Sequence, residues 1–188
     1  MLIDLMDDTA KREIALLSSF DEDEIGSKLT TNLISIRADI SIRQAMKELI
    51  AQAAENDNIS TIYVVDETQT LVGAIDLKDL IIARENMSLE DIIVTSYPYV
   101  YANEQIEDCI ERIKDYSEDS IPVLDSDNKL KGVLTAQDIT ELVDDEMGDD
   151  YAKLAGLTAE EDLQEPLTKS IRKRLPWLVI LLVLGLLV

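Results

Sequence analysis

The chain has 188 residues, with 39 acidic and 17 basic side chains, no histidine and a formal net charge of −22. So acidic a protein repels phosphate backbones, which argues against a nucleic-acid partner, and the lack of histidine removes the usual zinc sites and histidine acid–base catalysis. The single cysteine, Cys109, excludes an internal disulfide. Because the sequence also lacks an activated serine or cysteine arrangement and a phosphate-binding loop, we expect a protein that is not an enzyme.

The beginning of the chain predicts an extended stretch followed by a helix. We expect no signal peptide, because Asp4, Asp7 and Asp8 stand where a basic segment belongs. Residues 33–36 are extended in pattern, and a helix opens at Ser41. Its apolar residues recur at helical spacing, which indicates one buried face.

A hairpin and a second helix follow between residues 60 and 81. A β-branched strand ends at Asp66, and a polar turn at 67–70, a second short strand and a helix come after it. The same pattern recurs at 119–140, offset by 59 residues without a gap. The residues that coincide are Ile62 with Ile121, Val64 with Val123, Asp66 with Asp125, Leu71 with Leu130, Gly73 with Gly132, and Asp79 with Asp138.

The second copy also has a strand and a helix upstream of its hairpin. The strand is expected at 97–101 and contains Pro98, and the helix carries apolar residues at helical spacing from Ile106 to Ile113. The unit is therefore strand–helix–strand–strand–helix, present twice. Because about 60 residues bury too little surface to be stable alone, we expect the two copies to pack together.

This unit, with a glycine in its third strand and an aspartate one turn into its last helix, resembles a CBS domain, and two in tandem resemble a Bateman module. The resemblance covers about residues 30–142. It implies an α/β (α+β) fold of tandem CBS domains with flanking helices. Such modules regulate many unrelated channels and enzymes, so the fold alone does not give the function.

The flanks of the repeat resemble the MgtE family of magnesium transporters. Residues 16–37, LLSSFDEDEIGSKLTTNLISIR, are similar to the junction between an N-terminal helical domain and the first CBS domain. Residues 141–157, ELVDDEMGDDYAKLAGL, and 170–185, SIRKRLPWLVILLVLG, are similar to the connecting plug helix and the entry into the first membrane helix. The implied organisation is the end of the N-terminal helical domain at 1–26, CBS domain 1 at 27–91, CBS domain 2 at 92–143, the acidic plug helix at 144–168, and a juxtamembrane segment with a truncated transmembrane helix at 169–188.

The apolar run at 177–188 is shorter than the about 20 residues that a spanning helix needs. It has no polar face to show to water, so we expect a truncated span rather than a helix docked on the domain. Arg172, Lys173 and Arg174 lie directly before the run, with Lys169 just upstream. Basic residues near a span favour the cytoplasmic side, so we expect the cell membrane as the location, with this region on its cytoplasmic side.

Acidic residues dominate the segment between 141 and 165, where Lys153 is the one basic residue. Asp138, Glu141, Asp145 and Asp149 follow one stripe of a helix. The stripe is either a solvated face or a place where carboxylates meet a divalent cation, since Mg²⁺ needs one or two carboxylates and retained waters. The sequence around Asp125 lacks the glycine and glutamate of an EF-hand, so we interpret it as a hairpin turn.

The MgtE resemblance implies specific Mg²⁺ ligands. They are Glu107 in the second CBS domain, Asp138 and Glu141 on its last helix, and Glu146 and Asp149 on the plug helix. Where the family has a further aspartate this chain has Ser117, for which Asp115 or Glu118 are the substitutes at hand.

CBS modules often bind adenine nucleotides, and the resemblance implies where ATP would bind. Asp79 and Asp138 hold the position that accepts from ribose hydroxyls, Lys78 would meet a phosphate, and Pro122 would line the adenine slot. The stacking aromatics of the family are replaced by Thr61 and Glu118. The simpler interpretation of Asp79 is a helix-start residue that accepts from backbone N–H groups.

The sequence therefore leads to one function and one alternative. We expect a homodimer, formed through the CBS domains, that senses Mg²⁺ and gates a Mg²⁺ transporter or channel, with ions bridging acidic faces to hold the closed state. The alternative is an adenine-nucleotide-sensing CBS module on another membrane transporter.

Overall fold

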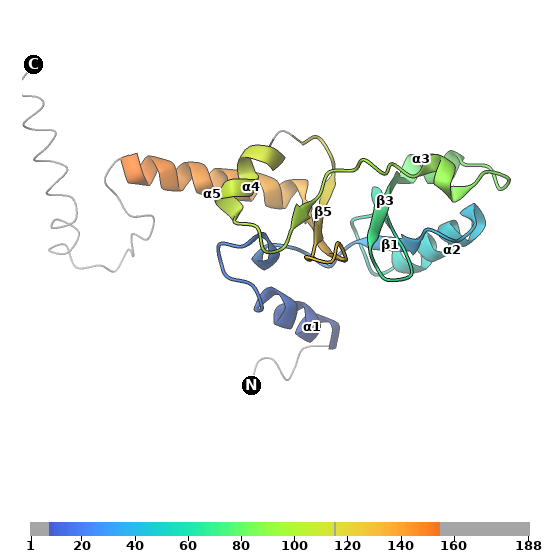
Figure 1. Ribbon diagram of the computed structural model, residues 1–188, viewed down its shortest axis with the longest axis horizontal. Helices are drawn as coiled ribbons and strands as arrows, with labels where there is room; N and C mark the ends of the chain where they lie inside the picture. The colour runs from blue at the N-terminus through green and yellow to red at the C-terminus, as the bar shows by residue number, and fades with distance from the viewer. Residues whose placement is uncertain (1–7, 115, 155–188) are drawn as a thin grey trace, which may run out of the picture. The chain divides into compact units, whose positions relative to one another are not determined.

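The computed structural model describes residues 8–114 and 116–154 (Figure 1). The chain divides into two compact units, Met1–Thr140 and Glu141–Val188, and helix α5 (Ala136–Leu154) runs from the first into the second. The expected juxtamembrane segment and transmembrane helix, and the acidic segment beyond Leu154, lie outside the described residues. In the part of the chain that is described, no helix is long and apolar enough to cross a membrane.

The first repeat is a three-stranded sheet with helices packed on one face. Its elements are β1 (Ile34–Arg37), α2 (Ile42–Gln52), β2 (Thr61–Val65), β3 (Leu71–Asp76), α3 (Leu77–Ile82) and the 3₁₀ turn η3 (Leu89–Ile92). Strand β1 pairs in parallel with β2, and β2 pairs antiparallel with β3. Helix α2 opens where predicted, with Ser41 as its N-cap, because Ser41 and Gln44 form a reciprocal capping box there. Ile34, Ile62 and Leu80 are among the fully buried side chains between sheet and helices.

The second repeat has the same element order and strand senses. Its elements are β4 (Val100–Tyr101), α4 (Ile106–Ile113), β5 (Ser120–Leu124), β6 (Leu130–Thr135) and α5. The strand predicted at 97–101 is shorter than expected and covers only its last two residues. Pro98 has no N–H to give to a ladder, which fits the late start of the strand. The predicted tandem of β-α-β-β-α units is otherwise confirmed.

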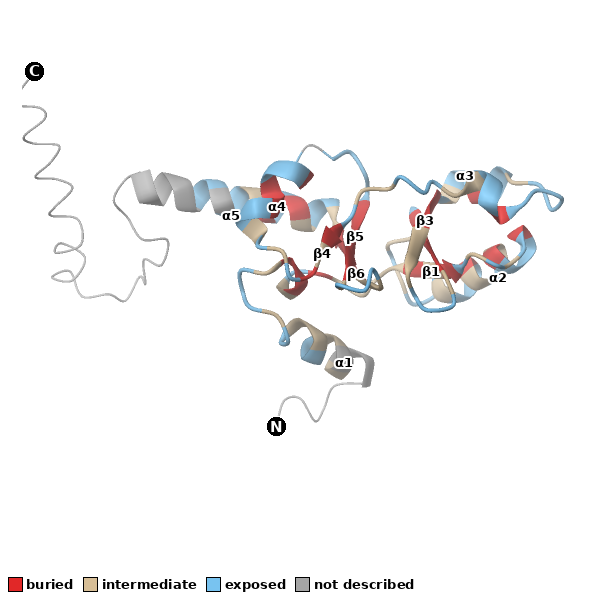
Figure 2. Cartoon of the chain, viewed as in Figure 1, coloured by how far each residue is buried: buried red, intermediate tan, exposed pale blue. Residues whose placement is uncertain are grey.

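The two repeats pack against each other through the faces of their sheets that the helices leave open. Tyr63, Ala74 and Val133 form a buried cluster that joins the repeats. The Tyr63 hydroxyl lies 2.7 Å from the Ser120 Oγ, and both residues are fully buried. Strands β2 and β5 are consequently buried along their whole length, and the buried residues concentrate on the strands of both sheets (Figure 2). The expectation that the copies pack together is confirmed.

The hairpin turns are built alike in both copies, as predicted. Oδ1 of Asp66 accepts from the N–H groups of Thr68 and Thr70, at 2.7 and 2.9 Å. Gln69 and Asn128, which coincide under the 59-residue offset, are the described non-glycine residues with positive φ, at 68° and 61°. Asp125 accepts two turn N–H bonds in the same way as Asp66, which confirms that its sequence is a hairpin turn.

The N-terminal segment consists of α1 (Asp8–Leu17) and a 3₁₀ turn, η2 (Ile25–Ser27). Oε1 of Glu13 in α1 accepts from the N–H and the hydroxyl of Thr31, at 3.1 and 2.9 Å. These bonds hold the helix to the residues that lead into β1.

Candidate functional site

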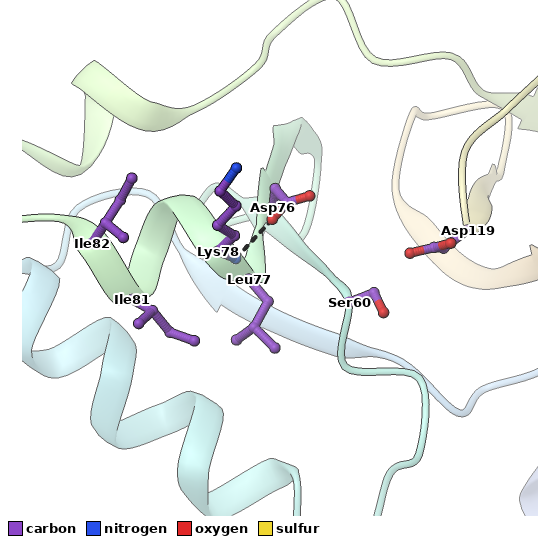
Figure 3. Close-up of a pocket in the computed structure, with 7 residues that line it drawn as sticks. All are labelled: Ser60, Asp76, Leu77, Lys78, Ile81, Ile82 and Asp119. Carbon is purple, nitrogen blue, oxygen red and sulfur yellow. Dashed lines mark hydrogen bonds between the residues drawn. The ribbon is translucent and has the colours of Figure 1, made fainter.

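An open cleft of about 370 Å³ lies at the start of α3 (Figure 3). It is lined by Ser60, Asp76, Leu77, Lys78, Ile81, Ile82 and Asp119. Ser60 and Asp119 coincide under the 59-residue offset and precede the second strand of each repeat. The cleft therefore lies where the two repeats meet.

Backbone bonds fix the walls of this cleft. The N–H of Leu77 donates to the Ser60 carbonyl at 2.8 Å, and in the other copy the N–H of Ala136 donates to the Asp119 carbonyl at 3.0 Å. Oδ1 of Asp76 caps α3 by accepting from the N–H of Lys78 at 2.7 Å. Lys78 is the basic residue among those that line the cleft, and Asp76 and Asp119 are the acidic ones.

The other residues predicted for a nucleotide are not among those that line the cleft. Asp79 is exposed in the first turn of α3, and the capping role considered for it belongs to Asp76. Pro122 is buried within β5 opposite Val133. Thr61 is also buried, in β2.

Asp138 occupies the place that Asp79 holds in the first copy, but its carboxylate is engaged. Its Oδ2 accepts from the N–H and the hydroxyl of Thr135, both at 2.7 Å, while the Thr135 hydroxyl oxygen accepts from the Asp138 N–H at 3.2 Å. The side chain is half-buried. This reciprocal pair closes the start of α5 through Oδ2 of Asp138.

The residues predicted to hold Mg²⁺ are spread over two helices. Glu107 is exposed in the first turn of α4, and Glu141 is exposed on α5, one turn beyond Asp138. Glu146 and Asp149 belong to α5, but their side chains lie outside the described part, as does the whole of Asp115. Ser117 and Glu118 are exposed before β5.

Carboxylate oxygens of this kind suit a hard cation such as Mg²⁺. Among the described side chains, however, no three acidic, histidine or cysteine residues gather closely enough to hold a metal ion. The single chain thus offers the right donor atoms without a closed site in its described part.

Cys109 lies in a polar cluster that the sequence did not predict. Its thiol donates to Oε2 of Glu104 at 2.9 Å, and Arg112 pairs with the same oxygen at 2.5 Å. Burial, and then the adjacent Glu104 carboxylate, raises the pKa of Cys109 to about 12. Burial alone would raise the pKa of Glu104, but the bonds from Cys109, Tyr101 and Arg112 hold it below its usual value. Cys109 therefore stays a protonated thiol at neutral pH and is not a nucleophile.

Sequence reasoning found Lys78 but missed Ser60, Asp76 and Asp119 as its neighbours in the cleft. The sequence signal that could have identified Ser60 and Asp119 is the 59-residue offset, because it equates these two residues at the start of the second strand of each repeat. Asp76 stands where the second copy has Thr135, and both are helix-start residues.

Comparisons with known proteins agree with this architecture. A family model for the CBS domain matches residues 23–86 and 89–145. The magnesium transporter MgtE of Enterococcus faecalis is 39% identical over 173 residues, which are 92% of this chain and 38% of that protein. The crystal structure of the soluble part of a magnesium transporter has a TM-score of 0.70 and 34% identity, over 77% of this chain and 56% of that one. The cytosolic domain of the Mg²⁺ channel MgtE in complex with ATP gives 0.69 and 29% identity, over 75% and 57%.

The chain spans about two fifths of the length of the curated relatives it matches. The two segments matched by the family model coincide with the two repeats of the structure. The chain therefore belongs to the CBS-domain family, and it is a tandem CBS region of the MgtE type.

Proposed function

We propose that this chain is the Mg²⁺-sensing regulatory region of a magnesium transporter or channel of the cell membrane, on the cytoplasmic side. The observation that carries the proposal is the 39% identity to a magnesium transporter over 92% of the chain. The formal charge of −22 supports it, because a protein so acidic attracts cations.

The proposed mechanism is a shift between two arrangements of acidic surfaces. In a homodimer joined through the CBS domains, Mg²⁺ bridges Glu107, Asp138, Glu141, Glu146 and Asp149 across facing surfaces. At an effective dielectric of 20, two unit charges 4 Å apart repel by about 4 kcal/mol, so such surfaces separate when the ion leaves. The ion stabilises only the state in which the carboxylates converge, and that state holds the pore closed. The oxygen donors of these side chains are the kind that Mg²⁺ takes, and one or two carboxylates with retained waters are enough to hold it.

The proposal is tested by thermal unfolding of the chain with and without Mg²⁺. A ligand of the folded state raises the melting temperature by mass action, so about 10 mM MgCl₂ should raise it more than an ionic-strength-matched sodium salt. Replacing Glu141 and Asp149 by Gln and Asn should remove that difference. The matched control replaces Glu55 and Glu90, two exposed carboxylates of the first repeat, by Gln. An equal shift in both salts, or equal loss in both double variants, contradicts the proposal.

A second candidate is nucleotide sensing in the cleft at Lys78. It is favoured by that cleft between the repeats and by the likeness to a cytosolic domain in complex with ATP. Equilibrium titration with ATP, without Mg²⁺ and then with it, tests it. We expect Lys78→Gln to weaken ATP binding while Lys47→Gln, on the exposed side of α2, leaves it unchanged. Absence of saturable ATP binding to the unmodified chain would remove this candidate.

A further inference from the structure

Residues 21–31 lead into the first repeat along the chain but are bonded to the second repeat; we call them the strap. The N–H groups of Ile25 and Gly26 donate to the carbonyls of Glu104 and Ala102, at 2.9 and 2.7 Å. In return the N–H of Ile106, the first residue of α4, donates to the carbonyl of Asp23 at 2.8 Å. The strap therefore follows the segment between β4 and α4.

The strap ends on the last strand of the second repeat. Thr30 and Val133 exchange two backbone hydrogen bonds of 2.9 Å, which makes them a fully bonded antiparallel pair at the edge of β6. Ile25 and Leu29 are 0% and 3% exposed, so the strap contributes side chains to the core as well as hydrogen bonds. At Asn32 the chain turns to the first repeat, where its Oδ1 accepts from the N–H of Asp57 at 2.9 Å.

Gly132 shows how closely the strap approaches. A Cβ atom at this position would lie 2.7 Å from the carbonyl oxygen of Thr30 and 2.6 Å from a methyl carbon of Leu29. Its counterpart Gly73 has the same role with another segment, since a Cβ there would lie 2.5 Å from the carbonyl oxygen of Val94. The repeated glycine is therefore required because the segment entering one repeat crosses the third strand of the other.

The strap is also joined to the N-terminal helix. Thr31 at its end donates its N–H and its hydroxyl to Glu13 of α1. A side chain of α1 is thus bonded to the residue next to the Thr30–Val133 pair, and α1 precedes the strap in the chain.

We propose that the strap folds as part of the second repeat and carries the packing state of that repeat to the N-terminal helix. The first repeat, which the chain enters directly after the strap, has the weaker influence on it. Any change of the second repeat that moves β6 or the start of α4 then moves α1. This regulatory link involves no ligand, so its test and the test of the Mg²⁺ proposal fail independently.

The test is amide hydrogen exchange, resolved to single residues, in the whole chain with a matched pair of glycine variants. Gly132→Ala should accelerate exchange at Gly26, Thr30 and Thr31 by about tenfold or more, because overpacking against backbone forces the strap away. Gly73→Ala should accelerate exchange at Ala74 and Val94 instead, since those residues form the corresponding pair. Unchanged exchange of the strap in Gly132→Ala, or equal acceleration of the strap in both variants, overturns the proposal.

A second pair serves if a glycine variant does not fold. Val64 and Val123 coincide under the offset and are both fully buried, so Val64→Ala and Val123→Ala make matched holes in the two repeats. Amide exchange in the strap should accelerate in Val123→Ala and accelerate clearly less in Val64→Ala. If they respond to Val64→Ala as much or more, the strap belongs to the first repeat and the proposal is wrong.

Discussion

The two repeats have the same topology, but different segments of the chain pair with their third strands. The first repeat has a β1 strand of four residues, whereas β4 in the second has two. The second repeat is completed by the strap from upstream, and β3 of the first pairs with Val94 from the linker that follows it. The segment that enters each repeat is thus hydrogen-bonded to the third strand of the other repeat. The folding unit is therefore the pair of repeats and not the single repeat.

The contact between the repeats is also less symmetric than the sequence offset. Around the Thr70–Lys129 bridge the contact is nearly two-fold symmetric, because equivalent residues of the two repeats exchange backbone hydrogen bonds. The Leu71 N–H donates to the Asn128 carbonyl, and the Leu130 N–H donates to the Gln69 carbonyl. Elsewhere the offset equates Tyr63 with Pro122, so one side of the contact has a buried phenol hydroxyl and the other has none. The buried contact between the repeats is therefore chemically asymmetric at this point.

The largest effect should come from separating the copies. We expect fragments 31–88 and 89–154, made separately, to lack a cooperative thermal transition by circular dichroism. The first would expose the cluster around Tyr63 and lose Val94, and the second would lose the strap. A cooperative melt of either fragment alone would show that the repeats are independent domains.

The buried hydroxyl pair tests the asymmetric side of the contact. Tyr63→Phe leaves the Ser120 hydroxyl buried without that partner and should lower the free energy of unfolding by about 1–2 kcal/mol. Denaturant unfolding measures it, with Tyr116→Phe as the exposed control. Equal effects of the two changes would mean that the buried hydroxyl contributes nothing to the contact.

A smaller effect on stability is expected from the N-terminal caps of α3 and α5. Asp76→Ala removes the cap of α3 and should cost about 1 kcal/mol in unfolding experiments. Asp76→Thr copies the Thr135–Asp138 arrangement of the second repeat onto Asp76 and Asp79, and should retain most of the stability. If Thr is no better than Ala here, the two helix starts are not equivalent.

The smallest effect concerns acid pH and the two hairpin turns. Bonds from the Thr70 and Thr68 N–H groups and the Thr68 hydroxyl hold the pKa of Asp66 below its usual value. Burial alone would raise the pKa of Asp125, but the Lys129 N–H and the Lys131 ammonium keep it low as well. A carboxylate whose pKa is lowered by folding stabilises the protein above its unfolded pKa, and that contribution is lost as the pH falls below about 4.

Asp66→Asn and Asp125→Asn should therefore flatten the acid limb of the stability curve measured by urea unfolding between neutral pH and about pH 3. Asp57→Asn, an exposed change in the loop before β2, is the control. An unchanged acid limb in both turn variants would show that these carboxylates do not stabilise the turns through charge.

Much of the fold could be predicted from the sequence because it is encoded locally. The Ser41–Gln44 cap, the Asp66 and Asp125 turns and the alternating β-branched residues each lie within a few positions of the structure they specify. The 59-residue offset then gave the pairing of the copies.

The strap and the cleft could not be predicted in this way. The Thr30–Val133 pair joins residues about 100 positions apart. In the sequence, Gly132 marks only the repeat, and nothing near it indicates that another segment of backbone crosses there. Likewise Ser60 and Asp119 become neighbours of Lys78 only after the copies pack. For the acidic stripe, spacing alone does not distinguish a solvated face from an ion site, since both place carboxylates one turn apart.

Transport measured in the full-length protein tests most directly whether Mg²⁺ acts on this region to close a pore. Flux would be followed in vesicles at low and at about 10 mM Mg²⁺ on the side that carries this region. We predict that Mg²⁺ suppresses flux in the unmodified protein, that the Glu141→Gln and Asp149→Asn double variant transports at both concentrations, and that the Glu55→Gln and Glu90→Gln control behaves as unmodified. Flux in the double variant that Mg²⁺ still suppresses to the same degree would contradict the account.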